Sequence, residues 1–152
     1  MSYKVYVHAD AEYAQSAKTL EDASRAALNH QAAAPGELSI VLVGEERMRQ
    51  FNLQFAHTDA PTDVLAFCDG SIDPDSNTTY HGDLIICYPI AELQASVGKH
   101  SLADELSLLT IHGVLHLLGH DHQAKVEKAA MWSVQSAILK DLGCKITSPG
   151  RT

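Results

Sequence analysis

The segment from His112 to His122 constrains the fold of this chain more than any other part of the sequence. On a helix, His112 and His116 lie one turn apart on the same face, so one metal ion fits between their imidazoles. Gly119 stands where a helix needs a left-handed residue to stop and reverse, and the reversal brings His122 back towards the same point. Three neutral imidazoles with one open position describe a catalytic zinc site, and we expect one Zn²⁺ per chain.

These residues also have simpler explanations. An isolated pair of histidines four residues apart more often consists of surface or core histidines than of ligands, but the third histidine and the helix-stopping glycine favour metal binding. His120 is expected to be exposed rather than ligating. Asp121 either orients a ligand imidazole or caps the turn, and it is one of two candidate catalytic residues.

The spacing of the histidines and Gly119 is that of the metzincin peptidases, so the segment is predicted to be a zincin-like metal helix. Those enzymes carry a glutamate general base directly after the first histidine, and this chain has Gly113 there. Without a carboxylate at that position the usual water-activating group is absent. A peptidase is therefore disfavoured.

Hydrophobic periodicity along the chain predicts four strands and five helices in the order βαβαββααα. The expected strands are residues 3–7, 37–43, 63–67 and 83–87, and the expected helices are residues 13–29, 45–55, 90–97, 101–118 and 125–142. Residues 69–77 are rich in Asp, Ser and Pro, which predicts an exposed loop across which the last two strands pair. We therefore predict one domain over residues 1–152, of the α/β (α+β) class, with a mixed sheet of roughly four strands packed with about five helices. The strand order stays open.

Composition limits the classes of function. The chain has 152 residues, of which 45% are hydrophobic and 20% charged, as is typical of a globular domain and not of a disordered chain. Its formal net charge is −8, and residues 50–98 contain no Lys or Arg. Overall charge therefore does not hold this protein on nucleic acid, because phosphate contacts need cations.

Three widely spaced cysteines without a C-x-x-C pair support neither a disulfide framework nor a cysteine zinc ribbon, and they indicate a reducing compartment. No apolar run approaches the length of a membrane span, and the N-terminus has no charged segment leading into an apolar one. We expect a cytoplasmic protein with neither a membrane segment nor a secretory signal.

The histidine segment, read as H-G-x-L-H-L-x-G-x-D-H, resembles the hallmark of the YbeY family of bacterial endoribonucleases. The similarity covers most of residues 37–122 and extends to Asn52-Leu53, Asp59, residues 61–67, Gly82-Asp83-Leu84 and Glu105-Leu106. The resemblance implies a zinc ion held by His112, His116 and His122. It also implies a single-strand-specific RNA hydrolase that matures ribosomal RNA and works with the 30S ribosomal subunit.

The chain departs from the family pattern at two positions. Ala56 stands where the family usually has an arginine, whose implied role is to help bind or cleave RNA, and Ala66 replaces the usual serine. His57 follows where a glycine is common. It is either a substitute cationic or hydrogen-bonding group, and so the second candidate catalytic residue, or an exposed loop histidine.

Two acidic sites have readings that the sequence leaves open. Thr62 and Asp63 either line a cleft near the metal or only begin a strand. Asp83 has the same two readings, although a buried polar group at the start of a strand usually has a definite partner.

The leading hypothesis is a metal-dependent endoribonuclease in which zinc acidifies a water or polarises a phosphoryl oxygen for attack on a phosphodiester. A non-catalytic ribosome-assembly factor with a bracing metal is the first alternative, and the missing arginine favours it. A metal-dependent hydrolase of peptides or small molecules is the second, and Gly113 argues against it. The acidic composition indicates that affinity for RNA comes from a local patch or from a protein partner such as the ribosomal subunit.

Overall fold

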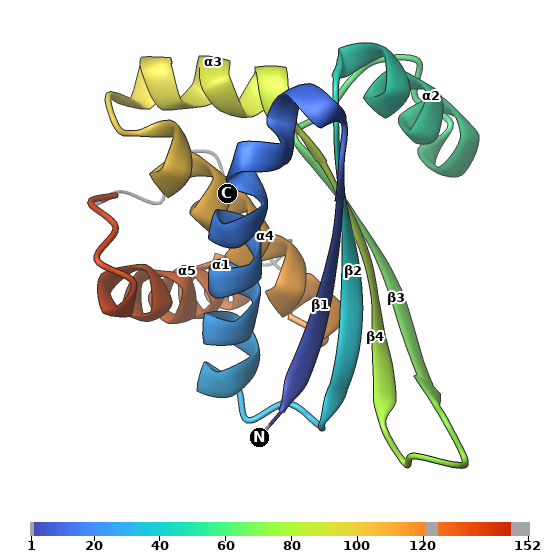
Figure 1. Cartoon of the computed structure of the whole chain (residues 1–152). Helices are drawn as coiled ribbons and strands as arrows, with labels where there is room; N and C mark the ends of the chain where they lie inside the picture. Colours follow the sequence, from blue (N-terminus) through green and yellow to red (C-terminus); the bar gives the residue numbers. More distant parts are fainter. Residues whose placement is uncertain (1, 121–124, 147–152) are drawn as a thin grey trace.

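The computed structural model describes residues 2–120 and 125–146, which form a four-stranded mixed sheet with helices packed on it (Figure 1). The strands are β1 (Tyr3–Ala9), β2 (Gly36–Val43), β3 (Val64–Ile72) and β4 (Thr79–Cys87). The α-helices in these residues are α1 (Ala17–His30), α2 (Glu45–Ala56), α3 (Tyr88–Gly98), α4 (Leu102–Leu117) and α5 (Lys125–Asp141), and a short 3-10 helix, η1 (Ala11–Ser16), precedes α1. The predicted α+β class and element order are confirmed.

The strands have the order β1-β2-β4-β3 in the sheet. β1 pairs in parallel with β2, because α1 carries the chain back between them. β2 pairs in parallel with β4, and here it is β3 that carries the chain back. β3 is an antiparallel edge strand on β4, with Phe67 opposite Asp83 and Leu65 opposite Ile85. The prediction that the last two strands pair is confirmed.

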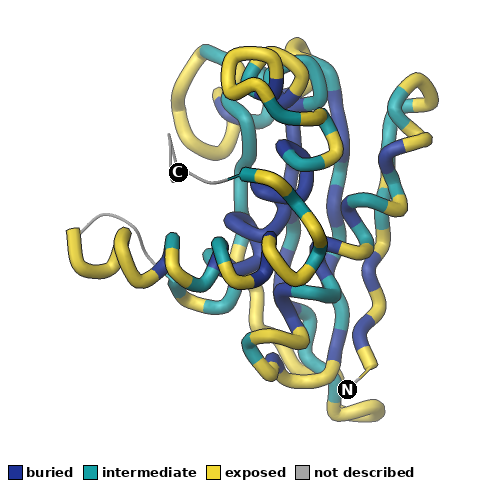
Figure 2. Tube along the Cα trace, turned by 90° about the vertical axis from the view of Figure 1, so that its left-hand side faces the viewer, coloured by how far each residue is buried: buried dark blue, intermediate teal, exposed yellow. Residues whose placement is uncertain are grey.

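Alternate strand residues point to two different layers. Leu38, Ile40, Leu42, Leu84 and Ile86 belong to the main core together with the buried sides of α1 and α4. Figure 2 shows the buried part of the chain gathered where the sheet meets these helices. The opposite side carries a smaller cluster of Val43, Met48, Ile85 and Cys87, which α2 covers at one end of the sheet (Figure 1). We call the side that carries Ser39, Val41, Phe67, Asp83 and Ile85 the open face.

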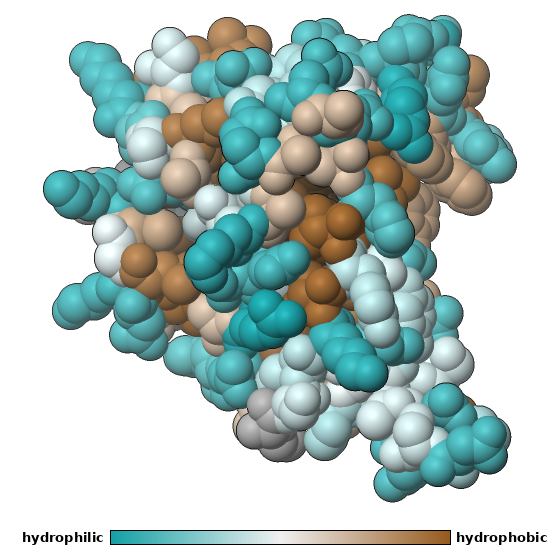
Figure 3. All heavy atoms as spheres, in the orientation of Figure 1, coloured by the Kyte–Doolittle hydropathy of each residue, from teal (hydrophilic) through white to brown (hydrophobic). Residues whose placement is uncertain are grey.

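The β3–β4 hairpin differs from the expectation from sequence. A loop is predicted over residues 69–77, whereas β3 continues to Ile72 and β4 begins at Thr79. A bulge between Cys68 and Ser71 keeps the strands paired through the Asp-rich stretch. The hairpin tip projects from the body and carries hydrophilic residues (Figure 3). The loop prediction was wrong outside the tip, because the polar composition reflects exposure and not the absence of a strand.

The Ala-rich helix begins later than its pattern predicts. Helical spacing starts at residue 13, whereas Ala11–Ser16 form η1 and α1 starts at Ala17. Tyr13 of η1 stacks on Tyr88 at the start of α3, with ring centroids 4.2 Å apart. A contact distant in sequence therefore accompanies the tighter turn. Nowhere in the part of the chain that the structure describes is a helix long and apolar enough to cross a membrane.

Candidate metal centre

α4 runs through the interior, which explains why its sequence is apolar on nearly every side. Residues 105–115 are all buried, and Ser101 caps the helix by accepting a hydrogen bond of 3.0 Å from the Asp104 backbone N–H. A Cβ atom at Gly113 would come within 2.7 Å of a Leu84 methyl group on β4. Glycine therefore allows the helix to lie close to the sheet, and a glutamate general base of the peptidase type does not fit at this position.

α4 ends at a left-handed glycine, as the sequence predicts. Gly119 has φ +97°, its N–H donates to the carbonyl of His116 at 3.0 Å, and the N–H of His120 donates to that of Leu115 at 2.9 Å. These two hydrogen bonds form a Schellman motif, which turns the chain away from the helix axis. Asp121 and His122, the candidate catalytic residue and the expected third ligand, lie outside the described residues.

His112 and His116 come together at the C-terminal end of α4. Their Nε2 atoms lie 3.1 Å apart and their ring planes are inclined at 75°. Two nitrogens bound to one tetrahedral Zn²⁺ at about 2.0–2.1 Å are roughly 3.3 Å apart. His112 is 8% exposed and His116 is half-buried, so the pair is largely sheltered from water. The spacing fits two ligands of one metal ion.

Gln135 of α5 orients the imidazole of His112. Its side-chain Oε1 accepts a hydrogen bond of 2.7 Å from Nδ1 of His112. With the proton on Nδ1, the Nε2 atom that faces His116 carries the lone pair that a metal ligand needs. Gln135, which is 1% exposed, was not predicted as part of the site. Its signal was a polar side chain on the buried side of an amphipathic helix.

Two other candidate histidines have different surroundings. Nε2 of His120 lies 2.8 Å from Oε1 of Gln31 at the end of α1, so His120 is half-buried and hydrogen-bonded and the prediction of exposure was wrong. His57 is exposed and ends α2 with φ +56°, a left-handed conformation that favours glycine. No described contact joins His57 to His112 or His116.

Asp63 and Asp83, for which the sequence allows two interpretations each, differ in their surroundings. Asp63 begins β3, where its Oδ1 accepts a hydrogen bond of 2.7 Å from the Val64 N–H and its Oδ2 one of 3.5 Å from Gln94. Asp83 lies on the open face and accepts a hydrogen bond of 2.5 Å from the Tyr80 hydroxyl. Burial and this hydrogen bond raise the pKa of Tyr80, so the hydroxyl remains a donor. Asp83 therefore faces away from α4 and the histidine pair.

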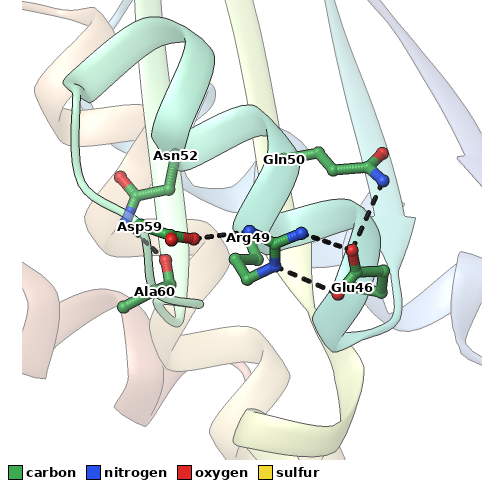
Figure 4. Close-up of polar contacts among 6 residues, drawn as sticks. All are labelled: Glu46, Arg49, Gln50, Asn52, Asp59 and Ala60. Atoms are coloured by element: carbon green, nitrogen blue, oxygen red, sulfur yellow. Dashed lines mark hydrogen bonds and ion pairs between the residues drawn. The ribbon is translucent and has the colours of Figure 1, made fainter.

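Arg49 directly precedes residues 50–98, which contain no Lys or Arg. Its side chain contacts the loop that follows α2 (Figure 4). Its guanidinium donates to Asp59 at 2.5 Å and to Glu46 at 2.6 and 3.1 Å. Asn52 also holds this loop, because it donates to the carbonyl of Ala60 at 2.8 Å. The two carboxylates raise the pKa of Arg49. A guanidinium is thus present beside the loop, but carboxylates already neutralise it.

Within residues 2–120 and 125–146, no three His, Cys, Asp or Glu side chains are placed to hold a metal ion together. Cys68 of β3 borders the histidine pair, since its Sγ lies 3.5 Å from the carbonyl oxygen of His116. The candidate centre in the described chain therefore consists of His112 and His116, supported by Gln135.

Known proteins resemble this chain over nearly its whole length. A family model described as Endoribonuclease YbeY matches residues 4–143. A Dehalococcoides mccartyi protein named Endoribonuclease YbeY is 40% identical over 140 residues, covering 84% of this chain and 88% of the relative. A Salinispora tropica protein of the same name is 43% identical over 113 residues, covering 68% and 72%. The solution structure of TM1509 from Thermotoga maritima has a similar fold, with a TM-score of 0.58 and 22% identity over 97% of this chain and 99% of that one.

Proposed function

The chain belongs to the YbeY endoribonuclease family, and on this premise we propose that it is a zinc-dependent endoribonuclease that cleaves single-stranded RNA. The observation that supports zinc binding is the pair of Nε2 atoms of His112 and His116, 3.1 Å apart, with Nδ1 of His112 bonded to Gln135. The proposed substrate is ribosomal RNA, cleaved during maturation and quality control of the 30S subunit. The 30S subunit or one of its proteins is the proposed partner.

One Zn²⁺ per chain is proposed to bind His112, His116 and His122. When bound there, Zn²⁺ supplies Lewis-acid chemistry, which polarises a phosphoryl oxygen and acidifies water. The buried α4 holds the two described imidazoles at a fixed separation, and Gln135 keeps His112 in the tautomer with a lone pair on Nε2. Asp121 and His57 are the two proposed candidates for proton transfer.

A non-catalytic ribosome-assembly factor with a bracing metal is the second candidate. Two observations favour it. Ala56 stands at the family's arginine position, and the nearby guanidinium of Arg49 is already ion-paired with Glu46 and Asp59 and so is not available to a phosphate. A peptide hydrolase is disfavoured, because Gly113 leaves no room for the carboxylate that such enzymes use.

The test is cleavage of labelled single-stranded and double-stranded RNA by the zinc-loaded chain and by His112→Ala and His116→Ala. We expect the wild type to cleave single-stranded RNA and not double-stranded RNA. In both variants we expect zinc to be lost and the cleavage activity to fall more than about 100-fold. His8→Ala, at an exposed position of β1, is the matched control and should retain both.

The competing outcomes are distinct. A chain that binds one zinc ion and sediments with 30S subunits but cleaves no RNA would support the assembly factor. RNA cleavage that survives the loss of both histidines would contradict the zinc-dependent mechanism.

A further inference from the structure

The open face of the sheet carries a groove beside α2. The groove has a volume of about 400 Å³ and is lined by Val41, Phe51, Phe55, Phe67, Asp83 and Ile85. Its floor consists of two neighbouring cross-strand pairs. Val41 of β2 pairs with Ile85 of β4, and Phe67 of β3 pairs with Asp83 of β4. Its wall is the C-terminal half of α2.

Three phenylalanine rings form a continuous cluster along this groove. Phe51 and Phe55 lie one turn apart on α2, with ring centroids 6.2 Å apart and planes inclined at 17°. Phe55 meets Phe67 edge to face, with centroids 5.2 Å apart. Phe55 nevertheless stays 52% exposed. Large aromatic surface left in water at the rim of a groove is typical of a binding site and adds little to the core.

A single carboxylate lies among these apolar side chains. Asp83 stands directly opposite Phe67, and the described hydrogen bond to its side chain, from the Tyr80 hydroxyl, goes to Oδ1. A carboxylate accepts about four hydrogen bonds, so Oδ2 and the second lone pair of Oδ1 retain capacity for two donors of a ligand. The groove therefore offers stacking surface and an acceptor, and its negative charge keeps phosphate out.

We propose that this groove binds one base of the single-stranded RNA substrate, stacked on Phe55 with its N–H donors directed to Asp83. The assignment rests on the proposed endoribonuclease function. Aromatic side chains bind bases by stacking because every base has a π-face, and unpaired bases are read through hydrogen bonds to their Watson–Crick edges. Guanine is the preferred base, because its N1–H and N2–H donors lie side by side and match a carboxylate.

The edge strand β3 connects the groove to the histidine pair. Phe67 points into the groove, and the next residue, Cys68, points to the other face, where its Sγ lies 3.5 Å from the carbonyl oxygen of His116. No strand covers the outer edge of β3 in the described sheet. An RNA strand that crosses this edge reaches both sites, with its uncharged base in the acidic groove and its phosphates outside it.

The test uses the zinc-loaded full chain and uncleavable 2′-O-methyl octamers of uridine that carry one central guanosine, inosine or adenosine. Affinity is measured by fluorescence anisotropy. We expect the guanosine octamer to bind about tenfold more tightly than the adenosine octamer, with inosine, which lacks the N2 amino group, in between. Asp83→Asn should remove this preference, and Phe55→Ala should weaken binding of all three octamers about tenfold.

Matched variants control for general damage. Glu37→Gln changes a carboxylate on β2 outside the groove, and Leu53→Ala truncates an exposed side chain of α2 outside the groove, so both should bind as the wild type does. Phe55→Tyr keeps the ring and should keep affinity. Thermal unfolding of each variant confirms that it is folded.

Unchanged base preference in Asp83→Asn together with unchanged affinity in Phe55→Ala overturns the base-binding groove, even where the wild type cleaves RNA. Loss of binding to 30S subunits or to a Lys/Arg-rich peptide in these two variants, with RNA affinity intact, overturns it in favour of a protein partner. A wild-type chain that neither binds nor cleaves any RNA overturns the proposed function itself.

Discussion

The two faces of the sheet come from the same four strands and differ in what they leave exposed. On the side of α1 and α4, Leu38, Ile40, Leu42, Leu84 and Ile86 have no exposed surface. On the open face α2 covers one end, and Phe67 is half-buried beside the more exposed Phe55. A fully packed face fixes side chains in one geometry, as metal ligands need, whereas an uncovered face offers surface to a partner.

Polar groups show the same contrast. On α4, His112 is bonded to Gln135, and Nε2 of His100 lies 2.6 Å from the fully buried carboxylate of Glu105. On the outer side of α2, Arg49 forms ion pairs with carboxylates that are 65–66% exposed. Loss of a buried partner leaves a desolvated group unsatisfied, while a surface ion pair exchanges readily with water. Substitutions near α4 should therefore have larger effects than substitutions near α2.

Among substitutions that leave both histidines in place, the largest effect is expected at Gln135. Gln135→Leu removes the acceptor that holds Nδ1 of His112, so zinc affinity should fall about 10–100-fold. Gln135→Glu keeps an acceptor at the same place and should retain affinity. Competition with a chromophoric chelator measures both variants. Wild-type affinity in Gln135→Leu would show that the packing of α4 alone orients the imidazole.

Gly113→Ala tests how closely the covered face is packed. The added Cβ would lie 2.7 and 3.0 Å from the two Leu84 methyl groups. Overpacking typically destabilises a protein by about 1–3 kcal/mol, whereas the better helix propensity of alanine stabilises it by up to about 1 kcal/mol. We therefore expect the unfolding free energy to fall by about 1–2 kcal/mol. Urea denaturation measures this loss.

The contact with Leu84 can be isolated in the same experiment. Shortening Leu84 to alanine is destabilising alone, but in the Gly113→Ala background it should cost less, because it removes the clash. Purely additive effects would mean that the helix shifts away from the sheet without strain.

The histidine helix was predictable because its constraints are local. The four-residue spacing of His112 and His116 and the stop at Gly119 depend only on helix geometry, and the structure confirms both. Gln135 lies 23 residues from His112 along the chain, so no local pattern pairs them. Ligation by His112, His116 and His122 remains a prediction, because His122 lies outside the described residues.

Strand order and the open face were harder to predict for the same reason. The groove depends on the register that places Phe67 opposite Asp83, and on the packing of Phe55 against Phe67, and both contacts join separate elements. The loop prediction for residues 69–77 failed because polar composition indicates exposure equally in loops and in strands without a covered face. Sequence therefore predicted elements well and contacts between elements poorly.

At the end of α2, Ala56→Arg is expected to have a moderate effect. The position is exposed, and a new guanidinium there supplies two parallel donors for a phosphate, which Arg49 does not offer while it is paired with Glu46 and Asp59. RNA affinity should rise about three- to tenfold, and the slope of log affinity against log salt should steepen by about one. Fluorescence anisotropy over a salt series measures both.

His57→Ala is the control for this gain. If His57 already takes the place of the arginine, its removal should weaken RNA binding in the natural chain and matter less in the Ala56→Arg background. No change in affinity or salt slope in Ala56→Arg would show that the arginine's role does not transfer to this chain.

The smallest effect is expected at His57 itself, where backbone and side chain can be separated. A left-handed conformation destabilises a residue with a Cβ by about 1–2 kcal/mol, and glycine removes this strain. Glycine's extra freedom in the unfolded chain opposes the gain by about 0.4–1 kcal/mol, so His57→Gly should stabilise the fold by about 0.5–1 kcal/mol. Lys99 ends α3 with φ +58°, almost the same as the φ +56° of His57, so Lys99→Gly should give the same gain in urea denaturation. Equal gains with unchanged RNA cleavage would assign His57 to ending the helix. If cleavage falls in His57→Gly but not in Lys99→Gly while both proteins become more stable, the imidazole acts on the RNA, since neither strain nor unfolding can account for that loss.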